Sequence, residues 1–287
     1  MTTAEIYELK LLACKVRTDI LNSIHTAASG HIGGSMSAAD VLVWLYYRQM
    51  NVDPSDPGMA DRDRFVLSKG HAAPALYAVL AERGFFPVEE LSTLRKLHSR
   101  LQGHPNMNLT PGIDMTTGSL GQGISAAAGL ALSLKLTGKS SRVYALLGDG
   151  ELQEGQVWEA FMFASHHKLS NLCILIDRNR LQIDGQTKDV MNISPVEKKL
   201  ESFGLSVQRI DGHSFPELEK GFSWAETAEN GPCAIVLDTV KGKGVSFMEN
   251  NAGWHGKAPN DEEHALALLE LEEQMRILKE EHYDSIA

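Results

Sequence analysis

The sequence has few cysteines and no disulfide pattern. Its three cysteines, Cys14, Cys173 and Cys233, are odd in number, lie far apart in the sequence and stand among apolar residues. This arrangement favours buried thiols over a disulfide framework. We therefore expect a reducing compartment, the cytoplasm.

The chain also lacks a long apolar run and an excess of basic residues. No stretch reaches membrane-spanning length, and residues 1–15 mix charged with apolar side chains where a signal peptide has an apolar core. The formal net charge is -10, whereas nucleic-acid affinity comes largely from clustered Lys and Arg. We expect neither a membrane nor a nucleic acid as a partner.

The remaining composition is that of a folded enzyme. The chain has 287 residues, of which 43% are hydrophobic and 22% charged, as in ordinary proteins with a sizeable core. Length alone leaves open whether it forms one large α/β domain or two. No internal repeat, low-complexity tract or linker is evident.

Short apolar runs alternate with amphipathic stretches along the chain. The runs are bounded by polar residues or glycine, as buried strands are, and cover 64–68, 142–147, 172–176, 205–210 and 233–240. Apolar residues at helical spacing predict helices over 4–28, 73–83, 120–136, 157–167, 215–228 and 262–282. This order predicts an α/β fold: a doubly wound, mostly parallel sheet with right-handed crossovers and helices on both faces.

In such a sheet, ligands bind at the carboxyl ends of the strands. The segments that follow the predicted strands are Lys69-Gly70-His71, Gly148-Asp149-Gly150, Asp177-Arg178-Asn179, Asp211-Gly212-His213 and Lys241-Gly242-Lys243-Gly244. Asp149 and Asn179 follow consecutive strands, so we expect them side by side. A carboxylate and an amide oxygen, with glycines that let backbone N–H groups approach, suit a hard divalent cation carrying a diphosphate. Taken alone, Gly-Asp-Gly is more often a plain turn.

Six motifs then occur in one order over nearly the whole chain: Ser29-Gly30-His31, Leu67-Ser68-Lys69-Gly70-His71, Gly103-His104-Pro105, Thr117-Gly118-Ser119-Leu120-Gly121-Gln122-Gly123, Gly148-Asp149-Gly150-Glu151 and Trp254-His255-Gly256. Together they resemble the transketolases, and Gly148-Asp149-Gly150 followed by Asn179 resembles the thiamine diphosphate signature. The resemblance implies a single diphosphate-binding (PP) domain over 1–287, with a helical extension over about 261–287.

The resemblance also implies a metal and cofactor site. Asp149, the side chain of Asn179 and the backbone carbonyl of Leu181 would bind Mg²⁺, for which Ca²⁺ or Mn²⁺ can substitute. The N–H of Gly150 would donate to the diphosphate of thiamine diphosphate. Further cofactor contacts implied are the backbones of Gly118 and Leu120, and His71 and His255 near the diphosphate and thiazolium.

His31, His104 and His255 resemble the histidines of the family's sugar channel. Transfer of a two-carbon ketol unit from a ketose phosphate to an aldose phosphate moves protons on hydroxyl and carbonyl oxygens. An imidazole that titrates near neutrality can donate and accept them. Arg95, nine residues before His104, has the spacing of an arginine at the channel mouth that helps to hold acceptor phosphate. It also lies in a helical pattern with Lys96, where it is equally compatible with a solvated surface charge.

The resemblance covers only part of a transketolase. Full-length members continue into a pyrimidine-binding domain and a C-terminal domain, so we expect the partner to be a separate C-terminal transketolase subunit, in a heterotetramer of two plus two chains. Glu154 resembles the family's glutamate that reaches the partner active site, and it also suits a helix N-terminus. The small residues of 126–131 favour a helix packed against a partner or, equally, within the chain. The rival hypotheses are the corresponding subunit of a 2-oxo acid dehydrogenase and a non-catalytic module of the same fold.

Overall fold

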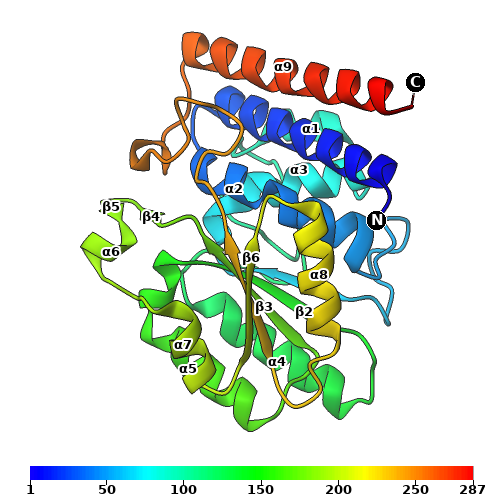
Figure 1. The fold of residues 1–287 in the computed structure, drawn as a ribbon, viewed down its shortest axis with the longest axis vertical. Helices are drawn as coiled ribbons and strands as arrows, with labels where there is room; N and C mark the ends of the chain where they lie inside the picture. The colour runs from blue at the N-terminus through cyan, green and yellow to red at the C-terminus, as the bar shows by residue number, and fades with distance from the viewer. Residues whose placement is uncertain (287) are drawn as a thin grey trace.

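A parallel sheet of five strands forms the centre of the computed structural model, which describes the backbone of residues 1–286 and the side chains of residues 1–282 (Figure 1). Its strand order is β1-β2-β3-β7-β6, and every pairing is parallel. The strands are β1 (Arg64–Leu67), β2 (Val143–Gly148), β3 (Leu172–Arg178), β6 (Ser206–Asp211) and β7 (Cys233–Asp238). The prediction of a parallel sheet is confirmed.

The strands contribute alternate residues to two apolar layers. Along β2, Tyr144 and Leu146 join one cluster of buried residues, whereas Val143, Ala145 and Leu147 join the other. Because successive side chains point to opposite faces and both faces are covered, the central strands need no polar face. This is why they stand in the sequence as continuous apolar runs.

Helices cover both faces of the sheet, as expected (Figure 1). The first apolar layer lies against α1 (Thr3–Ala27), α2 (Ile32–Trp44), α3 (Ala73–Arg83) and α8 (Phe215–Glu226). The second lies against α4 (Gln122–Leu136), α5 (Gly155–His166) and α7 (Val196–Ser202). The connections carry the 3-10 turns η2 (Gly70–Ala72), η3 (Val88–Thr93), η4 (Gly150–Gln153) and η5 (Ala252–Trp254), the π-helical turn η1 (Leu45–Gln49), the short helix α6 (Thr187–Val190) and a hairpin of β4 (Leu181–Gln182) and β5 (Gly185–Gln186).

Local chemistry explains where α1 and α4 begin. The side chain of Thr2 accepts from the N–H of Glu5 and the Glu5 side chain accepts from the N–H of Thr2, a capping box that starts α1. Gly121, with φ +82°, precedes α4, so the helix predicted from residue 120 begins two residues later. No periodic signal marks α2 in the sequence because all of its residues are buried, which leaves no polar face to reveal a helical period.

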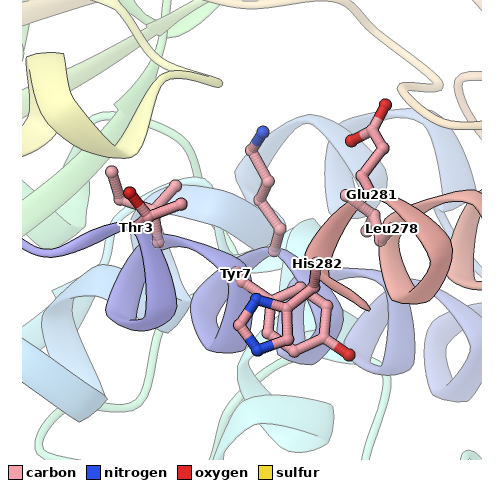
Figure 2. A pocket seen from close by; sticks show the side chains of 7 residues that line it. Thr3, Tyr7, Leu278, Glu281 and His282 are labelled. Carbon is pink, nitrogen blue, oxygen red and sulfur yellow. The ribbon is translucent and has the colours of Figure 1, made fainter. Parts of the chain in front are cut away.

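The C-terminal helix α9 (Asp261–Ile286) packs along α1 (Figure 1), and its Ala267 and Leu271 join the first apolar layer. Near its end the ring of His282 stacks on that of Tyr7, with centroids 3.8 Å apart (Figure 2). A hollow of about 100 Å³ beside this stack is lined by Thr3, Ile6, Tyr7, Lys10, Leu278, Glu281 and His282. The helix predicted over 262–282 is therefore present, and the last residue of the predicted extension, 287, lies outside the described residues.

The prediction that the three cysteines are buried thiols is confirmed. Cys14, Cys173 and Cys233 are buried and form no disulfide, and Cys173 lies opposite Cys233 across strands β3 and β7. Within the part of the chain that the structure describes, no helix is long and apolar enough to cross a membrane.

Candidate functional site

A cavity of about 380 Å³ opens at the carboxyl ends of β2, β3 and β7. Every residue predicted for the site, with the exception of Arg95, lines it: His31, His71, His104, Gly118, Leu120, Asp149, Gly150, Glu154, Asn179, Leu181 and His255. These residues come from segments up to 224 positions apart, from His31 to His255. The fold therefore gathers the predicted residues in one place.

Asp149 stands directly after β2 and is only 2% exposed. One carboxylate oxygen accepts from the N–H of Gly150 at 2.8 Å and the other from the N–H of Arg180 at 2.7 Å. Burial, reinforced by the neighbouring charge of Asp177, raises the pKa of Asp149 to about 6. A carboxylate held with so little water and beside a second carboxylate favours a bound cation.

Asn179 and Leu181 follow the neighbouring strand β3 and supply two further oxygens. The side-chain nitrogen of Asn179 donates to the carboxylate of Asp177 at 3.1 Å. The side-chain oxygen of Asn179 accepts from the N–H of Leu181 at 3.1 Å. Among the side chains that the structure describes, no group of three or more His, Cys, Asp or Glu could hold a metal ion. The predicted set does not need one, since it comprises one carboxylate, one amide and one backbone carbonyl, all hard oxygen donors that fit Mg²⁺.

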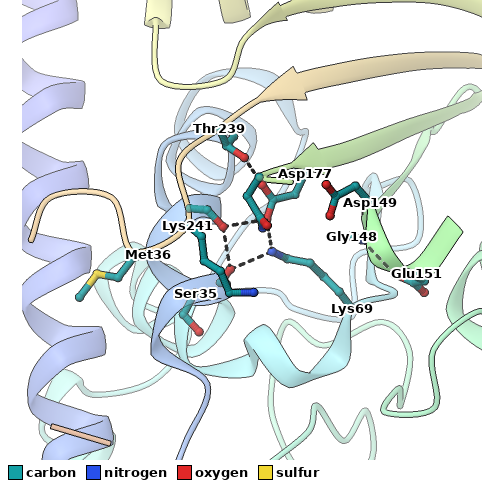
Figure 3. A network of polar contacts seen from close by, with 12 residues as sticks. Ser35, Met36, Lys69, Gly148, Asp149, Glu151, Asp177, Thr239 and Lys241 are labelled. Atoms are coloured by element: carbon teal, nitrogen blue, oxygen red, sulfur yellow. Dashed lines mark hydrogen bonds and ion pairs between the residues drawn. The ribbon is translucent and has the colours of Figure 1, made fainter. Parts of the chain in front are cut away.

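Two buried lysines reach the same cavity, and no role was predicted for either. Lys69 is 1% exposed and its ammonium contacts the carboxylate of Asp177 and, at 2.8 Å, the carbonyl of Gly34 (Figure 3). Lys241 is 2% exposed and approaches Nδ1 of His255 at 2.8 Å and the carbonyl of Leu181 at 3.1 Å. Burial, with Lys69 nearby, lowers the pKa of Lys241 to about 8. Such cations suit an anionic ligand.

Both lysines belong to the segments that follow predicted strands, so their place at strand ends could have identified them as candidate site residues. Asp177 carries the same signal. Its carboxylate also accepts from Ser37 at 2.7 Å and contacts Thr239 (Figure 3), so it holds together residues from α2, β3 and the segment after β7.

Three of the predicted histidines form a cluster. Their ring centroids lie 5.2 Å apart for His31 and His71, 5.4 Å for His31 and His255, and 5.2 Å for His71 and His255. His104 packs over Gly118, where an added Cβ would come within 3.2 Å of its ring. Nδ1 of His31 is buried and has no hydrogen-bond partner in the described part of the chain, so this cluster presents a polar atom for a ligand.

The surroundings of these imidazoles lower their pKa values below the ordinary value. Burial, followed by the charges of Arg95, His104 and Lys241, lowers the pKa of His31 to about 4. Burial and Lys241 lower that of His255 to about 3. Burial likewise lowers the pKa of His71 and of His104. These shifts favour the neutral ring, which offers one donor and one acceptor nitrogen.

Arg95 lies at the edge of the site. It is exposed and has φ +59°, so it sits in a turn after η3 and the helical pattern suggested for it is wrong. Its guanidinium lies over Gly103, within 2.9 Å of where an added Cβ would stand. Because its charge contributes to lowering the pKa of both His31 and His104, Arg95 faces the histidines although it does not line the cavity.

Glu154 is exposed on the cavity rim and occupies the N-cap position of α5, with no side-chain cap bond. The prediction that Glu154 stands at a helix N-terminus is therefore confirmed. Its Cβ lies close to Gly121, which precedes α4, so it also stands where the glycine-rich 117–123 segment meets α5.

Residues 9–275 match the family model described as transketolase, thiamine diphosphate binding domain. The chain belongs to the transketolase family. It is 45% identical over 267 residues to the 6-deoxy-6-sulfo-D-fructose transketolase subunit SqwG of Clostridium sp. (strain MSTE9), a match that covers 93% of this chain and 97% of that protein. It is 40% identical over 268 residues to an apulose-4-phosphate transketolase subunit of Actinobacillus succinogenes, covering 93% and 96%.

Longer transketolases match over part of their length. The transketolase of Homo sapiens is 44% identical over 254 residues, which cover 88% of this chain and 40% of the human protein. The crystal structure of transketolase from Campylobacter jejuni superposes with a TM-score of 0.88 at 32% identity, covering 96% of this chain and 43% of that one. The chain thus spans less than half of these transketolases and nearly all of the relatives named as subunits.

Proposed function

We propose that this chain is the cofactor-binding subunit of a two-chain transketolase, in which it holds Mg²⁺ and the diphosphate of thiamine diphosphate. In this proposal the whole chain, residues 1–287, forms one PP domain with the helical extension at its end. One observation carries the proposal: the oxygens of Asp149, Asn179 and Leu181 and the ammonium groups of Lys69 and Lys241 face one cavity beside a cluster of histidines.

The protein's part in binding follows from these contacts. Asp149, the amide oxygen of Asn179 and the carbonyl of Leu181 would hold Mg²⁺, with Ca²⁺ or Mn²⁺ as substitutes, because all three are hard oxygen donors. The N–H of Gly150 and the ammonium of Lys241 would donate to the diphosphate. His71, Gly118, Leu120 and Glu154 complete the proposed cofactor contacts.

Thiamine diphosphate supplies the electron sink that carbon–carbon bond cleavage beside a carbonyl requires. This chain would contribute His31, His104 and His255, whose neutral rings can orient sugar hydroxyls and relay protons. Arg95 at the edge would attract the anionic end of an acceptor. Ketose and aldose phosphates are the proposed substrates, and the sulfosugar named for the Clostridium relative adds sulfosugars as candidates.

The partner is inferred from the relatives. Those that the chain spans almost completely are named as subunits, whereas the human enzyme carries more than twice the matched length in one chain. We propose a partner with the pyrimidine-binding domain, in a heterotetramer of two plus two chains, with Glu154 near the partner site. The buried free cysteines support the proposed cytoplasmic location.

Calorimetry tests the cofactor part. Thiamine diphosphate should bind in the presence of Mg²⁺ and not in excess EDTA, and Asp149→Ala should abolish binding. Binding that ignores both the metal and the substitution would refute the proposed site. With the partner present, a donor panel of xylulose 5-phosphate, 6-deoxy-6-sulfofructose, pyruvate and branched 2-oxo acids should show turnover with sugars alone; turnover with 2-oxo acids would contradict ketol transfer.

A further inference from the structure

A buried chain of polar groups links α1 to the segment that carries Lys241. The guanidinium of Arg17, on α1, donates to both carboxylate oxygens of Asp40, on α2, at 3.2 and 2.5 Å. Asp40 in turn lies 2.6 Å from Nδ1 of His213, in the connection between β6 and α8. Nε2 of His213 accepts the backbone N–H of Val240 at 2.9 Å. Arg17 and Asp40 are buried, with exposed fractions of 6% and 7%, and His213 is largely buried, with an exposed fraction of 13%.

The hydrogen bonds fix the state of the His213 ring. A backbone N–H can only donate, so Nε2 must be unprotonated and the ring proton must lie on Nδ1, where it donates to Asp40. Burial alone would raise the pKa of Asp40, but Arg17 and then His213 outweigh it and lower that pKa to about 2. The acceptor that orients His213 is thus a permanent carboxylate.

Val240 directly precedes Lys241, and the backbone on either side is also held. Thr239 contacts Asp177 through its hydroxyl, the carbonyl of Lys241 accepts from the N–H of Asn250 at 3.0 Å, and the N–H of Gly242 donates to Gly33 at 3.0 Å. His213 provides the one side-chain contact to the backbone of Val240 among the described residues. It therefore orients the peptide between Thr239 and Val240, one residue before Lys241, whereas the carbonyl of Val240 accepts from the N–H of Lys243 at 3.2 Å.

The position of the Lys241 ammonium depends on this orientation. Its stem lies against Gly33, where an added Cβ would come within 2.9 Å of its Cγ, and its ammonium must pass this point to reach His255 and Leu181. A small rotation of the Thr239–Val240 peptide would shift the backbone that leads into Lys241 and displace its ammonium from the cavity, because the side chain is packed on all sides.

We infer that His213 is a positioning residue, which sets the place of the Lys241 ammonium in the diphosphate site by holding the N–H of Val240, with Asp40 and Arg17 fixing its own ring. This inference rests on the proposed function, since it assigns His213 a role in cofactor affinity. The competing interpretation is that His213 only ties α2 to the loop after β6 through Asp40 and leaves Lys241 unaffected.

Two substitutions separate these interpretations because each keeps one half of the imidazole. Asn has its amide near the place of Nδ1, so His213→Asn can still donate to Asp40 but cannot reach Val240. Gln places its amide oxygen near Nε2, so His213→Gln can still accept from Val240 while Asp40 keeps Arg17. Each variant loses one hydrogen bond, so similar melting temperatures are expected for the two.

Two measurements on the full chain distinguish the variants. Amide exchange of Val240 should be about tenfold faster in His213→Asn than in the wild type, as expected for a lost hydrogen bond, and nearly unchanged in His213→Gln, with the β3 amides as internal reference. Calorimetric affinity for thiamine diphosphate with Mg²⁺ should follow the same order, with about a tenfold loss for Asn and less than about twofold for Gln.

The inference is overturned if Asn binds the cofactor like the wild type, if Gln is as weak as Asn, or if exchange changes and affinity does not. Failure of the proposed function has a different signature: the wild type itself would then take up no thiamine diphosphate. In that case the exchange of Val240 alone still decides whether His213 holds this peptide.

Discussion

Replacing Asp149 by Asn should stabilise the chain in the absence of ligands and destabilise it in their presence. The carboxylate is buried beside Asp177, and its pKa is raised from 3.8 to about 6, which corresponds to about 3 kcal/mol of unfavourable environment for the charged form at neutral pH. Asn removes the charge but can accept only one of the two backbone N–H bonds, at a cost of about 1–2 kcal/mol. The net gain is about 1–2 kcal/mol, or roughly 2–6 °C in melting temperature for a chain of this size.

The pH dependence follows from the direction of the shift. Because the pKa of Asp149 is higher in the folded than in the unfolded chain, this group stabilises the folded state at a pH below the ordinary pKa of 3.8. That stabilisation is lost as the pH rises to about 6. Near pH 4 only the lost hydrogen bond counts, so Asp149→Asn in EDTA should be no more stable than the wild type there and should reach its full advantage above pH 6.

Thermal unfolding in two buffers provides the assay. In EDTA at pH 7.5 the Asn variant should melt above the wild type. With Mg²⁺ and thiamine diphosphate at about a hundred times the dissociation constant, the wild type should gain about 2.7 kcal/mol and overtake the variant, which should gain nothing. The reasoning is refuted if Asn melts lower in EDTA, the behaviour of a plain Gly-Asp-Gly turn, or if both proteins gain equally from the ligands.

Three further predictions concern other parts of the molecule. Burial and Glu82 raise the pKa of Asp19 to about 7, so the free energy of unfolding of the wild type should fall as the pH rises from 4 to 7. Asp19→Asn removes this titration. In denaturant titrations the free energy of unfolding of the variant should therefore rise relative to that of the wild type over this range, by on the order of 1–2 kcal/mol. Gly242→Ala places a Cβ 2.3 Å from a carbonyl oxygen at φ +78° and should cost about 3 kcal/mol or more, whereas Gly129→Ala, on α4 with no atom within 4 Å of the added Cβ, should gain about 0.5–1 kcal/mol by the same titration. Because the Lys241 pKa is about 8 and a bound anion raises it, calorimetry in buffers of different ionisation enthalpy should detect proton uptake when thiamine diphosphate binds at pH 8; proton release would contradict this placement of Lys241.

The sequence was most informative where chemistry and topology coincide. Asp149 and Asn179 follow consecutive apolar runs, and neighbouring parallel strands bring their carboxyl ends together, so their proximity could be predicted. The strand-end rule also selected Lys69, Lys241 and His213, but not their contacts. Whether a lysine at a strand end turns into the cavity depends on packing from helices and loops distant in sequence.

Three other features could not be predicted from the sequence, for physical reasons. Helix α2 has no polar face because it is enclosed on all sides, so periodicity could not reveal it. The low pKa values of His31 and His255 arise from burial and from Lys241 and Arg95, whose distances depend on the tertiary fold. The residues around Arg95 have a pattern that is typical of a helix, so the turn with positive φ at Arg95 could not be predicted either.

The most direct test of the account is a ketol-transfer assay on three samples: this chain alone, a partner carrying the pyrimidine-binding domain alone, and an equimolar mixture, each with Mg²⁺, thiamine diphosphate, a ketose phosphate donor and an aldose phosphate acceptor. The account predicts transfer in the mixture, none in either separate chain, and none in a mixture made with Asp149→Ala. Full transfer by this chain alone, or an active mixture that tolerates Asp149→Ala, would contradict it.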